Sequence, residues 1–66
     1  MSQNIAEAIS NMISHLQESL DDAEKFDRGN AAAGTRVRKS LQDIASSCKT
    51  ARTAVIDIRN ERKASE

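Results

Sequence analysis

The sequence predicts an all-α fold in which two long helices form an antiparallel hairpin. No proline occurs among the 66 residues, and both glycines lie in one short central segment, at Gly29 and Gly34. Apolar residues recur at three- and four-residue spacing on both sides of that segment, and they nowhere alternate with a period of two. Because proline and glycine are the residues that most disrupt a helix, we expect one helix on each side of the segment.

The first helix is expected over residues 3–27 and the turn over residues 28–30. The apolar positions of this helix share one face: Ile5, Ile9, Met12, Leu16, Ala23 and Phe26, with Ile13 and Leu20 beside them. Gly29 suits the residue after a helix end because it adopts a positive φ without strain. The Asn30 side chain can accept a hydrogen bond from a free amide of the next helix. Together these two residues predict the hairpin turn.

The second helix is expected over residues 31–63. Its apolar positions keep the seven-residue repeat of left-handed helix packing: Val37, Leu41, Ile44, Cys48, Ala51, Val55 and Ile58. At 1.5 Å per residue the first helix would be roughly 37 Å long and the second roughly 50 Å. The second helix should therefore extend past the first, with Arg59 and Arg62 beyond its end.

Residues 1–66 are expected to form a single helical-hairpin domain that dimerises. A chain of this length buries little surface by itself, and its only cysteine, Cys48, cannot form an internal disulfide. One hairpin covers only one side of each apolar stripe, so we expect two copies to form an antiparallel four-helix bundle. The residues expected in the core or dimer seam are Ile9, Met12, Leu16, Leu41, Ile44, Cys48 and Val55.

Charge divides the chain into two halves, although the formal net charge is zero. Residues 1–27 contain one basic and six acidic residues, a net charge of −5, and residues 28–66 contain nine basic and four acidic residues, a net charge of +5. On a helical wheel four of these bases fall within a sector of roughly 60° beside the apolar seam. They are Arg38, Lys49, Arg52 and Lys63. Arg36 and Lys39 lie near the helix start and point elsewhere.

A line of cations along a helix edge suits a phosphate backbone, because each neutralised phosphate releases counterions. We therefore take Arg36, Arg38, Lys39, Lys49, Arg52 and Lys63 as candidate DNA-binding residues. The alternative interpretation is a solvated helix face, which is normally charged. The amides of residues 31–33 offer a second place for an anion at a helix start, although small residues there also serve tight packing.

The sequence offers no catalytic or cofactor site. His15 and Cys48 lack partners for nucleophilic or metal chemistry, and Asp21, Asp22 and Glu24 splay apart on a helix, so we expect solvated carboxylates. No enzyme activity, metal, cofactor or small-molecule substrate is expected. The sequence contains no stretch that resembles a membrane span or signal peptide, which predicts a cytoplasmic protein.

The central segment resembles the bacterial linker-histone-like family, the chlamydial type of small nucleoid-associated protein. The matching residues are Lys25-Phe26, Gly29-Asn30, Ala32-Ala33-Gly34-Thr35-Arg36, Arg38-Lys39 and Leu41-Gln42-Asp43-Ile44. The resemblance implies a non-enzymatic protein of the nucleoid that binds double-stranded DNA through its backbone without sequence specificity. It also implies a short form, because fuller members carry a Lys/Ala-rich tail. The alternative function is a dimerisation or protein-interaction module that does not touch nucleic acid.

Overall fold

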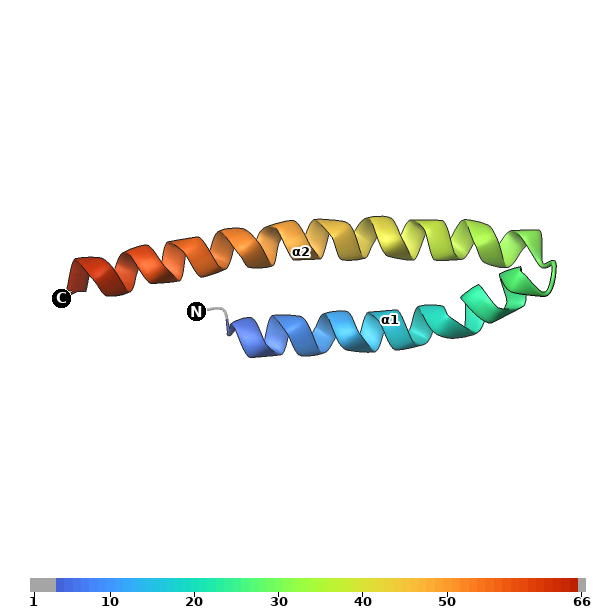
Figure 1. Cartoon of the computed structure of the whole chain (residues 1–66), viewed down its shortest axis with the longest axis horizontal. Coiled ribbons are helices and arrows are strands. Elements are labelled where there is room, and N and C mark those ends of the chain that lie inside the picture. The colour runs from blue at the N-terminus through green and yellow to red at the C-terminus, as the bar shows by residue number, and fades with distance from the viewer. Residues whose placement is uncertain (1–3, 66) are drawn as a thin grey trace.

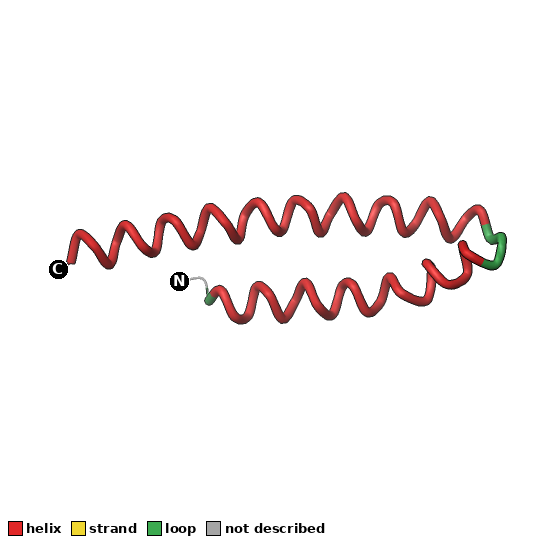
Figure 2. The backbone as a smooth tube through the Cα atoms, viewed as in Figure 1, coloured by secondary structure: helices red, strands yellow, loops and turns green. Residues whose placement is uncertain are grey.

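A computed structural model of the chain describes residues 4–65 and consists of two antiparallel helices joined by a tight turn (Figure 1). Helix α1 spans Ile5–Asp27 and helix α2 spans Ala31–Ser65. No strand occurs within these described residues, and the only loop between the helices is the short turn seen in Figure 2. The predicted all-α hairpin is therefore confirmed. Residue 3, where the first helix was expected to begin, lies outside the described residues.

The turn is built by Gly29 and Asn30. Gly29 has a φ of +104°, a conformation that side chains disfavour. Its amide donates to the carbonyl of Phe26 at 2.9 Å, and the amide of Asn30 donates to the carbonyl of Lys25 at 3.0 Å. These are the two hydrogen bonds of the Schellman motif that ends many helices. The predicted helix stop thus has its expected geometry.

Asparagine side chains cap the starts of both helices. The Asn30 Oδ1 accepts a hydrogen bond from the amide of Ala33 at 3.1 Å, so Asn30 both closes the turn and caps α2. The Asn4 Oδ1 accepts a hydrogen bond from the amide of Glu7 at 3.3 Å at the start of α1. Each cap satisfies an amide that has no partner within its own helix.

The interface between the helices is narrow and contains mostly small or polar side chains. Among the residues whose burial is described, Ser19, Ala33 and Ile44 are the buried ones, with exposures of 8%, 0% and 8%. The Ser19 hydroxyl donates to the carbonyl of His15 at 2.9 Å, so this buried hydroxyl has a hydrogen-bond partner. The half-buried positions on α1 are Ile5, Ala8, Met12, His15, Asp22 and Ala23, and those on α2 are Gly34, Val37, Ser40, Ala51, Ala54 and Ile58.

Close contacts define how the helices align. The ring of Phe26 packs against Gly34, and the thiol of Cys48 contacts the Met12 sulfur at 3.6 Å. Asn4, Ile5 and Ala6 line one groove with Val55 and with the last turns of α2. The residue numbers of facing pairs therefore add up to about 60 along the whole hairpin.

The hairpin is long and thin, so it encloses little core. Its extents are 56 × 17 × 15 Å and its radius of gyration is 16.0 Å. A compact domain of this length would have a radius of gyration of about 11 Å. Helix α2 continues past the start of α1 (Figure 1), as the helix lengths predicted. Val55 lies level with Ile5 at this end, so Arg59 and Arg62 lie about one and two turns beyond the start of α1, where they line a groove with Asn4 and Ala6.

Candidate nucleic-acid interface

Four candidate cations, which we call the basic stripe, follow one edge of α2. All four are exposed: Arg38, Lys49, Arg52 and Lys63. Within the regular helix Ala31–Ser65 they fall in one sector of roughly 60°. From Arg38 to Lys63 the helix rises about 37 Å, which is close to one turn of B-DNA. The helix therefore presents its cations in a line of the length of one DNA turn.

Arg36 lies near the helix start and forms an ion pair with Asp22 on the other helix. Its Nη2 and Nε lie 3.0 and 3.1 Å from the Asp22 Oδ1, and the Asp22 side chain is 25% exposed. The hydrogen bond from Arg36 lowers the pKa of the Asp22 carboxyl below its ordinary value, and the charge of Lys25 adds to this effect. The same contact raises the pKa of Arg36. Asp22, expected as a solvated carboxylate, instead joins the two helices.

Lys39 also has a carboxylate partner, since its Nζ lies 3.8 Å from the Asp43 Oδ2 one helical turn away. Among the described residues, no salt bridge involves the basic stripe. The structure thus divides the six candidates into two groups. Arg36 and Lys39 each form an ion pair with a neighbouring acid, and the basic stripe forms none within the described part of the chain.

The seven seam residues separate into two environments within the hairpin. Ile44 is buried and Met12 is half-buried between the helices. The other five are exposed: Ile9 48%, Leu16 46%, Leu41 52%, Val55 39%, and Cys48. Sequence reasoning missed Ala8 and His15 as interface residues, because hydropathy carries no signal at small or polar positions. Their four- and three-residue spacing from Met12 was the available clue.

Most of the exposed apolar residues lie on one side of the hairpin, which we call the apolar face, whereas Ile56, which is 56% exposed, lies outside it. The apolar face contains Ile9, Ile13, Leu16, Leu20, Leu41, Cys48 and Val55. Most of these follow an interface position by one residue, as Ile9 follows Ala8 and Val55 follows Ala54, which is a rotation of 100°. Because the helices are antiparallel, a rotation of 100° from the interface toward the next residue points to the same side of the hairpin on both helices. The contact between Met12 and Cys48 agrees with this geometry.

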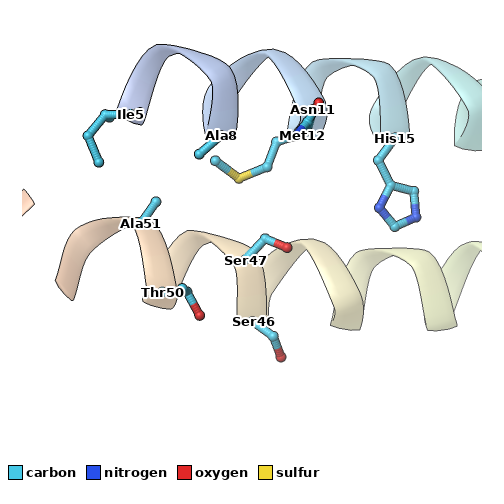
Figure 3. A pocket seen from close by; sticks show the side chains of 9 residues that line it. All are labelled: Ile5, Ala8, Asn11, Met12, His15, Ser46, Ser47, Thr50 and Ala51. Atoms are coloured by element: carbon cyan, nitrogen blue, oxygen red, sulfur yellow. The ribbon is translucent and has the colours of Figure 1, made fainter. Parts of the chain in front are cut away.

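The opposite side of the hairpin is polar. A groove of about 360 Å³ lies between the helices (Figure 3), and its lining includes Asn11, Ser46, Ser47 and Thr50. The side chains of Ile5, Ala8, Met12 and His15 point from α1 toward α2, and those of Ser47 and Ala51 point back. The described residues contain no cluster of three or more His, Cys, Asp or Glu suited to a metal ion. This groove therefore presents hydroxyl and amide groups to solvent.

The apolar face and the basic stripe meet near the turn. A groove of about 450 Å³ is lined there by Phe26, Val37, Arg38 and Leu41, together with small residues of the first turn of α2. Phe26 and Leu41 are 52% exposed.

No described helix has the length and apolar character of a membrane span.

These features define a helical hairpin with an exposed apolar face and a line of exposed cations along its second helix. The sequence model of the histone H1-like protein Hc1 family matches residues 6–61 of the chain. The protein therefore belongs to the histone H1-like Hc1 family, which confirms the resemblance to the chlamydial histone-like type. Searches of curated proteins and of solved structures gave no significant match.

Proposed function

We propose that this protein is a non-enzymatic, architectural DNA-binding protein of the nucleoid. It binds the phosphate backbone of double-stranded DNA without sequence specificity. The observation that carries the proposal is the basic stripe, whose four cations are exposed and form no salt bridge among the described residues. Membership in a histone H1-like family supports the same function.

The spread of the cations favours contact with phosphates over contact with bases. Arg38 and Lys63 are about 37 Å apart along the helix, whereas a helix that reads bases contacts only a few neighbouring pairs. Phe26 is the only aromatic residue, so stacking on exposed bases has little support. Arg36 and Lys39 are secondary contacts in this proposal, because a phosphate there must compete with Asp22 and Asp43.

The working unit in this proposal is a homodimer that forms a four-helix bundle. A hairpin with three buried residues among those described has too little core to be stable alone. The large side chains of the apolar face are 39–59% exposed and together present on the order of 500 Å² of apolar surface, near the upper limit for a monomer. A second copy removes this surface from water and brings the rest of the predicted seam into a core.

Fluorescence anisotropy with a labelled duplex of about 20 base pairs, repeated at several salt concentrations, tests the proposal. Four phosphate contacts predict a slope of about −3.6 in log K against log salt. A duplex of unrelated sequence should bind within about twofold. A chain that stays helical and fails to bind at low salt would refute DNA binding and favour the protein-interaction alternative.

A further inference from the structure

We infer that the two hairpins of the dimer pack with their turns at the same end, so that their basic stripes lie on opposite edges of the bundle. A two-fold axis can bring two apolar faces together with their helices aligned in only two ways. An axis parallel to the helices places both turns at one end, and α1 then lies against the partner's α2. An axis across the hairpin places the turns at opposite ends, and α2 then lies against the partner's α2. Charge distinguishes the two arrangements.

The arrangement with opposite ends brings like charges together. The basic stripe borders the apolar face, since Arg38 precedes Leu41 by three residues and Arg52 precedes Val55 by three. In this arrangement the stripes of the two copies run antiparallel along one edge. Along the bundle axis, Arg38 and the partner's Arg52 then differ in height by no more than about one helical turn. The two-fold symmetry creates the same close pair a second time, between Arg52 and the partner's Arg38. Like charges at this distance oppose the arrangement, most strongly at low salt.

The arrangement with turns at the same end brings opposite charges together. Glu24 follows Leu20 by four residues on the same side of α1, so it borders the apolar face as Arg38 does on α2. The alignment of Phe26 with Gly34 places Glu24 at the level of Arg36, about 3 Å along the axis from Arg38. Across the dimer, Glu24 therefore approaches the partner's Arg38. Both side chains are exposed, and neither forms a salt bridge among the described residues.

The number of duplexes that one dimer can contact depends on where the two α2 helices lie in the bundle. With the axis parallel to the helices, the two α2 helices occupy opposite corners of the bundle, and α1 of the partner lies between them on each side. Their basic stripes face away from each other, so one duplex cannot contact both stripes along their length. A dimer of this kind holds two duplexes side by side, and this last step rests on the proposed DNA binding.

Distances between spin labels decide the arrangement without DNA. The variant Arg28→Cys, in a Cys48→Ser background, carries a nitroxide at the turn. Turns at the same end predict a label separation of about 20 Å, and turns at opposite ends predict about 45–50 Å. The matched control Ser46→Cys lies near the middle of α2 and gives a similar distance in both arrangements. A long distance at position 28 overturns the inference, as does the absence of dipolar coupling at position 46 in a protein with helical circular dichroism.

Energy transfer between two separate duplexes, one labelled with a donor and one with an acceptor, then tests bridging. Transfer should rise when the protein is added and fall again when excess protein gives each duplex its own dimers. Binding by anisotropy without any transfer would overturn bridging and leave the proposed function intact. Absence of binding would refute the proposed function, and the spin-label distance would still decide the arrangement.

Discussion

The ring of Phe26 lies where a side chain at position 34 would begin. A Cβ built on Gly34 would be 2.6 Å from the ring Cε1, far inside van der Waals contact. Gly34 therefore allows α1 and α2 to approach at the closed end of the hairpin, and this contact helps to set the alignment of the whole interface.

Gly34→Ala should destabilise the protein, because the ring of Phe26 must leave its site. Overpacking costs about 1–3 kcal/mol, and the higher helix propensity of alanine returns about 1 kcal/mol. Thermal unfolding at one fixed protein concentration measures the difference. In a Phe26→Ala background the same substitution should raise the melting temperature. Destabilisation of equal size in both backgrounds would show that the contact with Phe26 is not its cause.

Asn30→Ala should lower the free energy of unfolding by about 1 kcal/mol, since it removes the acceptor for the amide of Ala33 and leaves that amide unpaired. Asn4→Ala is the matched control, because it removes the corresponding cap at the end of the chain, where a helix frays. Denaturant unfolding of both variants should show the larger loss at Asn30. A larger loss at Asn4 would contradict the assignment of the turn as the anchored end.

The pKa of Asp22 should lie below its ordinary value and return toward it in Arg36→Gln, because the hydrogen bond from Arg36 stabilises the carboxylate. A carboxyl whose pKa is lowered in the folded state stabilises the fold above its unfolded pKa of about 3.9. This contribution disappears as the pH falls through the folded pKa. NMR titration of the carboxyl carbon measures the shift directly.

Melting temperatures provide the corresponding stability test. Wild type should have a higher melting temperature than Asp22→Asn at neutral pH, and the two melting temperatures should converge as the pH falls below the lowered pKa of Asp22. Asp21→Asn removes a neighbouring carboxylate that forms no salt bridge among the described residues, so it should change the melting temperature less. A difference between wild type and Asp22→Asn that does not depend on pH would contradict this role of the pair.

Reversal of two stripe charges, Arg38→Glu with Lys49→Glu, should weaken DNA binding at least tenfold and reduce the salt slope by about 2. The control Lys25→Glu with Arg28→Glu changes the net charge equally at exposed positions outside the stripe. Anisotropy titrations of both variants, with circular dichroism to confirm their helix content, make the comparison. Equal losses would indicate an effect of net charge and not of the stripe.

Substitution of Leu16 by Glu should shift the dimer toward monomer, because it places a carboxylate in the middle of the apolar face. Ser46→Glu adds the same charge at an exposed position that points away from α1 beside the polar groove, and it should leave the dimer intact. Sedimentation equilibrium gives the molar mass of each variant. A wild-type chain that sediments as a monomer at every concentration would refute the dimer.

Local signals made most of the fold predictable. Gly29 and Asn30 act through their own backbone and side chain, so the helix stop and the cap needed no knowledge of the partner helix. The six candidate cations were readable for the same reason, since charge and helical spacing are properties of one chain segment. The ion pairs between the two helices could not be predicted from the sequence in this way. The contact between Arg36 and Asp22 joins residues 14 positions apart on different helices, and only their alignment reveals it.

The sequence by itself determined two helices, the turn between them, the basic second half and the family. Each of these depends on residue type and local spacing. The tertiary structure decided which stripe of each helix faces the other. Close approach at Gly34 and Ala33 allows small and polar residues such as Ser19 to form the interface, and it leaves larger residues such as Leu16 and Leu20 on an open face. Hydropathy alone does not distinguish these two stripes, because that choice depends on how closely two backbones can approach.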